Sequence, residues 1–447
     1  MNFLNLKLPS LSPAQILVLG FGAIIFFGGF LLMLPIASQD GMYTPFVDAL
    51  FTATSATCVT GLVVVDTGTH WNLFGQIVIM LLIQIGGLGF MSMASLFAFV
   101  FKRKITLKER LVLQEALNQL DIEGVVGLVR KVIFYSFAIE GVGAILYSAR
   151  FSFDMPFEKA IYFGVFHAVS MFNNAGFDIM GGYVSLTNYV GDWAINLTTC
   201  SLIVLGGIGF FVMSDLIEYR NKKRLSLHTK VVLTTTGLLI AIGTIVILIF
   251  EYTNTKTMAG LDFQGKFLSA LFQSITPRTA GANTLDIGSL RQATQFFIVI
   301  LMFIGASPGS TGGGIKTTTF ATLFGATIAM SQGKQNIVFF RYRLATERIL
   351  KAITLTLICL FLVVTVTMIL CTTERHSFLM VLFEVTSAFA TVGLTMGLTT
   401  QLTIVGKILI MFMMFIGRLG PLTLAFALKI NNEREVIRYP EGRVIIG

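Results

Sequence analysis

Four short loops, each ending in a glycine, are the part of this sequence whose residues could do chemistry. They occupy residues 57–61, 173–176, 276–281 and 391–393, and they end at Gly61, Gly176, Gly281 and Gly393. Each loop follows an apolar segment that is too short to cross a bilayer. Backbone carbonyls in such loops can replace the water shell of an ion, and glycine reaches backbone conformations that side chains disfavour. The pattern therefore predicts a cation filter that is built from backbone.

The elements that must position these loops repeat four times along the chain. Each unit has a long apolar run, a short apolar run, the loop and a second long apolar run. The first long runs are 14–36, 132–149, 231–250 and 352–371, and the short runs are 45–56, 157–172, 267–275 and 378–389. The second long runs are 71–101, 193–217, 296–330 and 402–428. Runs of these lengths predict eight transmembrane helices and four half-helices that re-enter the membrane.

Further sequence features align the four units with one another. The loop glycines are separated by 115, 105 and 112 residues. An apolar residue followed by glycine recurs in the second long runs, at Ile85-Gly86, Leu205-Gly206, Ile304-Gly305 and Ile416-Gly417. Serines lie six residues before the loop glycine at Ser55, Ser170 and Ser387, and phenylalanines lie ten before it at Phe51, Phe166 and Phe383, whereas Phe272 lies nine before Gly281. These agreements predict parallel repeats.

The predicted fold class is an all-α polytopic membrane protein, with four repeats of helix, pore helix and helix in pseudo-fourfold arrangement around one pore. The repeats are 1–125, 126–225, 226–345 with a broken second helix, and 346–447, which includes a cytoplasmic C-terminal tail. The half-helices would direct the negative ends of their dipoles at the pore, which favours a cation. No linker or separable soluble domain is expected.

The composition excludes an ordinary soluble protein. Hydrophobic residues make up 55% of the 447 residues and charged residues only 12%, against about 25% charged in soluble domains. The net charge of +9 comes from basic clusters that follow the second long runs, near residues 102–110, 220–224, 334–343 and 429–438. This is the pattern of cytoplasmic segments, so we expect a multi-pass protein with both termini in the cytoplasm and no nucleic-acid partner.

The second long run of the third unit differs from the others. Its 35 residues would form a helix of about 52 Å, whereas the hydrocarbon core is about 30 Å thick. Its middle, residues 305–316, is rich in glycine, so we expect a polar loop at mid-depth that obstructs or opens the pore. A phosphate-binding loop is disfavoured, because Ile315 separates Gly314 from Lys316.

Several charged residues lie inside apolar runs. Arg418 could form an electrostatic barrier below the filter or satisfy carbonyls at a helix end, and the sequence leaves both readings open. We expect Arg278 to hold its loop through hydrogen bonds to carbonyls, and Glu140 to pair with it or with another helix. His167 and Glu384 are expected to pack or to make hydrogen bonds.

Two further acids, Asp178 and Asp286, lie just beyond loops two and three. They could attract cations at the mouth of the pore, or they could be solvated residues of outer loops. The sequence does not decide between these readings.

The chain resembles the potassium transporter superfamily that contains bacterial Trk and Ktr and plant HKT proteins. The resemblance rests on the four loops, the glycine-rich insert and Phe-Ile-Gly-Arg-Leu-Gly-Pro-Leu-Thr (415–423). Further stretches are similar to the membrane subunit of Ktr systems, of the KtrB/KtrD type with KtrD slightly preferred. These stretches are residues 64–69, 82–91, 107–110, 114–119 and 276–281.

The resemblance implies potassium uptake across the cell membrane, often dependent on Na⁺, with K⁺ bound at filter carbonyls and no cofactor in the chain. It implies a homodimer that binds a cytosolic, nucleotide-binding (RCK-type) ring of regulatory subunits. The implied filter residues are Val59, Thr60, Gly61, Asn174, Ala175, Gly176, Thr279, Ala280, Gly281, Thr391, Val392 and Gly393. The implied gate residues are Gly305, Ser307, Gly309, Ser310, Thr311, Gly312, Gly313, Gly314, Lys316 and Arg418.

Two other classes were weighed against a potassium-conducting subunit. An alternating-access carrier for a small solute would be favoured by inverted repeats, whereas these repeats run in parallel. The membrane part of an ATP-driven enzyme would need a nucleotide-binding motif, and the chain has none. We therefore expect a transporter and not an enzyme.

Overall fold

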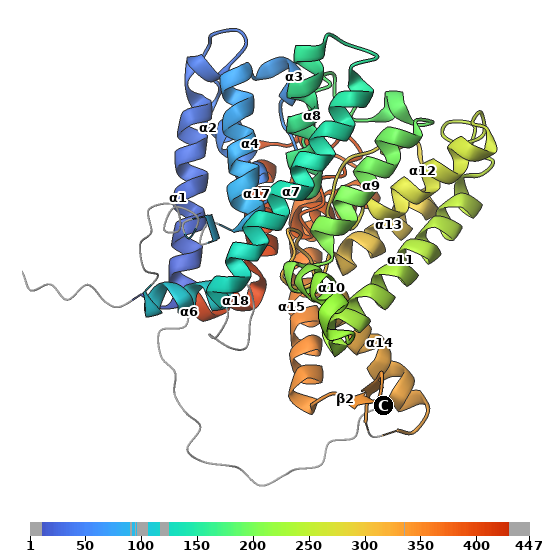
Figure 1. Cartoon of the computed structure of the whole chain (residues 1–447). Coiled ribbons are helices and arrows are strands. Elements are labelled where there is room, and N and C mark those ends of the chain that lie inside the picture. Colours follow the sequence, from blue (N-terminus) through green and yellow to red (C-terminus); the bar gives the residue numbers. More distant parts are fainter. Residues whose placement is uncertain are drawn as a thin grey trace, which may run out of the picture.

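The computed structural model of the chain describes residues 11–89, 92, 93, 95, 106–116, 125–334 and 336–428, and these residues are largely helical (Figure 1). The first long helices of the four units are α1 (Pro13–Met33), α7 (Val125–Phe151), α11 (Leu227–Glu251) and α15 (Thr346–Thr373). By length and composition these four helices could each cross a membrane, and the bent pair α9–α10 makes a fifth candidate. The first long runs were therefore predicted correctly as helices.

The short helices follow the predicted short runs. They are α2 (Phe46–Thr57), α8 (Phe157–Phe172), α12 (Phe263–Ile275) and α16 (Phe378–Phe389), and each packs against the long helix before it. The last three residues of each short helix are buried, and each helix ends where a glycine loop begins. The structure therefore confirms one buried short helix in front of each loop.

The second long runs are all interrupted, which corrects the prediction of a single break in the third. The elements are α4 (Leu73–Leu88); α9 (Trp193–Gly207) with α10 (Phe210–Lys222); α13 (Gln292–Ile304) with α14 (Thr317–Ser331); and α17 (Ile404–Leu419) with α18 (Pro421–Leu428). Gly89, Gly209 and Gly420 have φ angles of 82°, 94° and 84°. This left-handed conformation ends a right-handed helix, and α9 and α10 meet at 98°.

Side-chain caps mark the start of α4, α9 and α17, whereas α13 begins after Arg291 without such a cap. Asn72 Oδ1 accepts from Gly75 N at 3.1 Å before α4, and Asp192 Oδ1 accepts from Ile195 N at 3.0 Å before α9. Thr403 Oγ1 plays the same part before α17. Such caps satisfy backbone N–H groups that have no partner within the helix. They therefore determine how much chain is left to run from loops one, two and four to the next helix.

Contacts between units close into a ring. The second helix of each unit packs on the short helix of the next unit, α4 on α8, α9 on α12, α13 on α16 and α17 on α2. The last of these contacts joins the fourth unit to the first. Each short helix therefore packs both against the first helix of its own unit and against the second helix of the preceding unit.

The two ends of the helical body differ (Figure 1). The α1–α2, α7–α8 and α11–α12 connections lie at the top of the view, whereas α6 (Leu107–Ala116), α10, α14 and the antiparallel pair β1 (Val338–Phe339) and β2 (Tyr342–Arg343) lie at the bottom. Basic residues Arg110, Arg220 and Arg341 belong to these bottom elements. The clusters at 102–104 and 429–438 lie outside the described residues. The remaining short elements are η1 (Pro35–Ala37), α3 (Thr67–His70), η2 (Thr187–Tyr189), η3 (Ile287–Ser289) and η4 (Thr399–Gln401).

Large apolar side chains on the long helices are exposed. Phe27 on α1, Phe134 on α7 and Phe361 on α15 are 63%, 69% and 71% exposed. Water would make such a surface costly, whereas lipid tails match it. These faces are therefore suited to contact with the bilayer.

Candidate functional site

The four loop glycines lie in a closed ring. A methyl group placed on each glycine would overlap a backbone carbonyl of the next loop. The overlaps join Gly61 to Ala175, Gly176 to Ala280, Gly281 to Val392 and Gly393 to Thr60. Each partner carbonyl belongs to the residue just before the next loop glycine. Only glycine allows this approach, and the structure thus brings together four loops that the sequence separates by more than a hundred residues each.

The backbone is left-handed at two positions of every triplet. The first residues, Val59, Asn174, Thr279 and Thr391, have φ angles of 57°, 58°, 76° and 51°. The loop glycines have φ angles of 91°, 67°, 76° and 91°. Positive φ is a costly conformation for β-branched residues such as valine and threonine, and it persists where the surroundings enforce it, often at functional sites. The backbone is therefore shaped alike in all four loops although their side chains differ.

Hydroxyl groups at the ends of α2 and α16 hold loops one and four. Gly61 N donates to Ser55 Oγ at 3.0 Å, and Gly393 N donates to Ser387 Oγ at 3.1 Å. Both serines belong to the set that lies six residues before the loop glycine. The hydroxyl thus accepts from the glycine itself in these two loops.

In loops two and three, the hydroxyl donates a hydrogen bond instead of accepting one. Ser170 Oγ donates to the carbonyl of Phe177 at 2.6 Å, and Thr276 Oγ1 donates to the carbonyl of Ala282 at 2.5 Å. Sequence comparison of the repeats missed Thr276, because it lies five residues before Gly281 and not six. Phe272 could have revealed the shift, because it lies nine residues before Gly281 instead of ten and is therefore displaced by the same single residue.

The interrupted segment 305–316 lies directly under loops three and four. A methyl group on Gly312 would overlap the side chain of Thr279, and one on Gly313 would lie 2.5 Å from Thr391 Oγ1. The segment also folds on itself, since a Cβ on Gly305 would lie 2.5 Å from the carbonyl oxygen of Gly313. We call residues 305–316 the inner loop. Its glycines allow it to contact the filter loops without intervening side chains.

Backbone hydrogen bonds join the inner loop to the bend between α9 and α10. Ser307 N donates to Gly207 O at 3.0 Å, and Phe210 N donates to Gly309 O at 2.9 Å. A methyl group on Gly209 would lie 2.5 Å from Pro308 O. The bend in the second unit therefore provides the surface on which the inner loop rests.

Two cationic side chains bind carbonyls at the inner loop. Arg418 donates to the carbonyls of Thr311 and Gly86, and to that of Gly87 at 2.9 Å. Lys316 Nζ donates to the carbonyls of Gly312 and, at 3.3 Å, Gly313. Of the two roles considered for Arg418, the geometry supports the satisfaction of helix-end carbonyls, because Arg418 donates to carbonyls at the end of α4. Because it also bonds the inner loop, the same side chain joins units one, three and four.

Two further buried ionic residues, Arg278 and Glu140, have partners that the sequence did not predict. Arg278 donates from Nη2 to Thr236 Oγ1 at 3.2 Å rather than to loop carbonyls. Glu140 accepts from Gln84 Nε2 at 3.0 Å and from Asn173 Nδ2 at 2.9 Å, and not from Arg278. The expectation that Glu140 contacts another helix holds through Gln84 of α4. Pairing by charge was the wrong guide, because the partners are amides for Glu140 and a hydroxyl for Arg278, whose Nε has no hydrogen-bond partner among the described residues.

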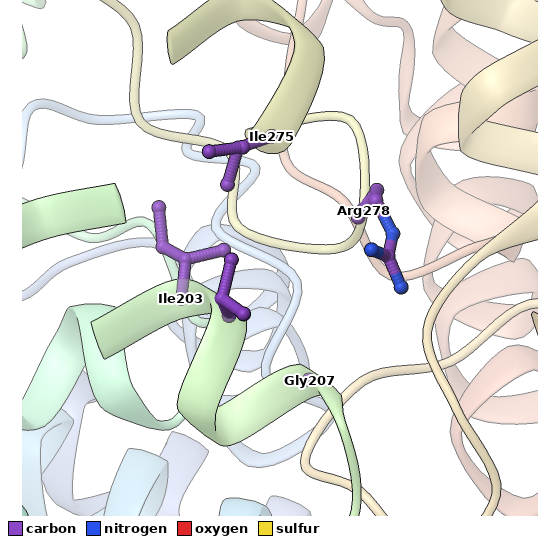
Figure 2. A pocket seen from close by; sticks show the side chains of 5 residues that line it. Ile203, Gly207, Ile275 and Arg278 are labelled. Atoms are coloured by element: carbon purple, nitrogen blue, oxygen red, sulfur yellow. The ribbon is translucent and has the colours of Figure 1, made fainter. Parts of the chain in front are cut away.

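A small cavity of about 10 Å³ lies beside Arg278, enough for about one water molecule. Its lining residues are Ile203, Val204, Gly207, Ile275 and Arg278. Figure 2 shows Arg278 on the loop that follows Ile275, with Ile203 of α9 opposite. The cavity separates loop three from the bend of the second unit and is too small to hold an organic ligand.

The acids beyond the loops take different roles. Asp286 accepts from Gly288 N at 3.1 Å and so caps η3, whereas Asp178 accepts from Met180 N at 3.0 Å. Burial raises the pKa of Asp178 to about 7, with a smaller contribution from nearby Asp66. Asp66, which we did not single out, accepts from Tyr183 N at 3.1 Å and joins the outer segments of units one and two.

A ring of re-entrant glycine loops inside a helical membrane protein is an architecture suited to conducting ions. A family model described as a cation transport protein, TrkH, matches residues 12–437, and the chain therefore belongs to this family. It is 47% identical to Ktr system potassium uptake protein B of Bacillus subtilis, over 98% of this chain and 97% of that protein. It is 42% identical to the potassium/sodium uptake protein NtpJ of Enterococcus hirae, over 98% of both chains.

Ktr system potassium uptake protein D of Bacillus subtilis is 37% identical over 98% of both chains, so the B type is more similar than the D type that the motifs led us to prefer. The fold matches the crystal structure of the potassium transporter TrkH from Vibrio parahaemolyticus with a TM-score of 0.72. That match has 17% identity and covers 95% of this chain and 86% of the other. The chain is thus an integral membrane protein of the TrkH family.

Proposed function

We propose that this chain takes up K⁺ across the cell membrane as the pore-forming subunit of a Ktr-type system. The observation that carries the proposal is the closed ring in which each loop glycine contacts a carbonyl of the next loop. The filter residues are the four triplets that end at Gly61, Gly176, Gly281 and Gly393. Relatives named as potassium uptake proteins, at up to 47% identity among those described above, support K⁺ as the transported ion.

The proposed architecture has eight spans in four repeats, 1–125, 126–225, 226–345 and 346–447, around one pseudo-fourfold axis. The ring of contacts between each second helix and the next short helix supports this arrangement. Among the described residues, four single helices reach spanning length, and we propose that each remaining span is a second helix that its break divides into two shorter helices.

The proposed gate consists of the inner loop and Arg418. The inner loop lies under loops three and four, and Arg418 holds it to the end of α4. An intramembrane loop in this position obstructs the path below the filter. Displacement of the loop would require the bonds from Arg418 and Lys316 to carbonyls to break, which makes these two cations the residues on which opening depends.

The orientation and partners are proposed on the same basis. Basic residues at the end that carries α6, α10 and the β1–β2 hairpin support a cytoplasmic position for that end and for both termini. We propose a homodimer that binds an RCK-type cytosolic ring, because relatives are named as parts of a Ktr system. Na⁺ dependence is part of the proposal, and a relative named for potassium and sodium uptake supports it.

An alternating-access carrier for a small solute is the alternative. Interrupted helices at mid-depth favour it, because such helices build substrate sites in carriers. The cavity beside Arg278 is far too small for an organic solute, and the loops form a continuous ring. We therefore retain the ion pore, without enzymatic activity or a cofactor.

Growth of a strain that lacks its own potassium uptake tests the proposal. The strain should grow at limiting K⁺ when it carries this chain, and growth should improve when a cytosolic regulatory partner is present. Uptake of ⁸⁶Rb⁺ by the same cells gives the rate. A chain that is inserted in the membrane but supports neither growth nor ⁸⁶Rb⁺ uptake, with or without a partner, would refute the proposed function.

A further inference from the structure

Each short helix carries one buried polar residue at the same place. This residue directly follows the aligned phenylalanine, and all four side chains are 0% exposed. The residues are Thr52, His167, Gln273 and Glu384. They form a second polar layer behind the loops, and only Glu384 is an acid.

Three members of this layer bond locally or have no protein partner. Thr52 Oγ1 donates to Asp48 O at 2.9 Å, and His167 Nδ1 lies 2.7 Å from Phe163 O. The side-chain amide of Gln273 has no hydrogen-bond partner among the described residues. In the part of the chain that the structure describes, none of the three forms a side-chain hydrogen bond with the segment that leaves its loop.

Glu384 differs because its carboxylate holds the segment beyond the filter. Thr395 Oγ1 donates to Oε2 at 2.7 Å, and Thr399 Oγ1 donates to Oε1. Thr395 and Thr399 lie two and six residues after Gly393. Gly397 N in turn donates to Thr395 Oγ1 at 3.0 Å. The carboxylate thus determines the path of residues 394–399, which we call the outer limb of loop four.

The charge on Glu384 is not balanced by a side chain. Throughout the segments that the structure describes, its partners are hydroxyl groups, and no ion pair reaches it. A buried carboxylate is costly unless it is compensated by hydrogen bonds or by an opposite charge. The carboxylate is 2.7 Å from Thr395, two residues from Gly393, and so lies within roughly 12 Å of that glycine. A cation in the filter would supply the positive charge that these hydrogen bonds do not provide.

We infer that Glu384 is an affinity-determining residue of the pore, whose carboxylate attracts the permeating cation from behind loop four and positions the outer limb. This inference rests on the proposed function and assigns to one repeat a fixed negative charge that the other three lack. At roughly 12 Å, and with the effective dielectric constant of about 20 that suits protein sites, such a charge changes cation affinity about tenfold.

The test separates charge from position with two variants. Glu384→Gln keeps groups that can bond both threonines but removes the charge, so KM for ⁸⁶Rb⁺ uptake should rise about tenfold with little change in the maximal rate. Glu384→Ala removes the hydrogen bonds as well, so it should also lower the preference for K⁺ over Na⁺. A loss of maximal rate at unchanged KM in both variants would overturn the inference.

Glu374→Gln is the matched control. Glu374 is also a buried acid, but it accepts from Thr403 Oγ1 at 2.6 Å and so holds the start of α17, away from the loops. Its replacement should leave KM unchanged. If Glu384→Gln raises KM no more than Glu374→Gln does, the carboxylate does not act on the ion and the inference is refuted.

A second measurement does not depend on transport. K⁺ should raise the Tm of the purified full-length protein in detergent, and Glu384→Gln should shift the half-maximal K⁺ concentration upward about tenfold. A wild-type chain that neither transports nor responds to K⁺ would overturn the proposed function and this inference together. A responsive wild type with an unshifted Glu384→Gln variant would overturn the inference alone.

Discussion

The ring of loop glycines and the helix breaks below it are built by opposite rules. In the ring, four loops with different side chains adopt the same left-handed conformations and make the same glycine-to-carbonyl contact. Below it, the second helix of every unit is interrupted, but within the described residues only the third unit inserts a long loop, the inner loop, at its break. The four units are thus alike in the loops where an ion would bind, and they differ at the helix breaks where its passage would be controlled.

The largest effect should follow from disturbing the ring. Gly281→Ala would overlap the carbonyl of Val392 and would place alanine at a φ of 76°. Because a misplacement of about 1 Å in a positioned site can cost about 100-fold, ⁸⁶Rb⁺ uptake should fall by at least that factor. Gly260→Ala is the control, since no atom lies within 4 Å of the added carbon. Equal uptake by the two variants would show that the ring does not carry the ion.

A shorter inner loop should act in the opposite direction. Deletion of 308–310 removes part of the segment that lies under the filter, so uptake per inserted molecule should rise several-fold. Uptake is to be measured as initial ⁸⁶Rb⁺ rates after quantifying protein in the membrane. Unchanged or lower rates in a folded, inserted variant would contradict an obstructing role of the inner loop. The third unit would then have no role in gating that the other units lack.

Smaller effects should distinguish the two hydroxyl arrangements. Ser387→Ala removes the acceptor for Gly393 N, whereas Ser170→Ala leaves the carbonyl of Phe177 without its donor. Each change should cost about 1 kcal/mol of stability, because one buried hydrogen bond is lost. Only Ser387→Ala should lower K⁺ over Na⁺ preference, since only there does the bond reach the loop glycine. Thermal unfolding and competitive uptake measure the two quantities.

The smallest effect concerns Asp178. With its pKa raised to about 7 by burial, this acid is mostly charged at pH 8 and mostly neutral at pH 6. If Asp178 attracts cations at the mouth of the pore, loss of its negative charge should raise KM for K⁺ by about twofold as external pH falls. Asp178→Asn should remove this dependence and should resemble the wild type at low pH. A wild-type KM that is constant from pH 8 to pH 6 would show that Asp178 does not act on the ion.

The short helices and the loops that follow them could largely be predicted from the sequence. Short apolar runs before each glycine identified α2, α8, α12 and α16, and the excess length of one run revealed the inner loop. The breaks at Gly89, Gly209 and Gly420 were missed, because glycine also packs helices and its backbone angle cannot be read from its identity. The partners of Glu140 were missed for another reason. They depend on which helices become neighbours, and Gln84 lies 56 residues away in sequence.

The closed ring also determines how a mutation changes the loops. Because all four loops belong to one polypeptide, a change in the gene alters a quarter of the ring and leaves three quarters intact. In a ring of four identical chains, the same change would occur four times at once. The inner loop of the third unit and the lone acid of the fourth are differences of a kind that only a single-chain ring can accumulate one at a time.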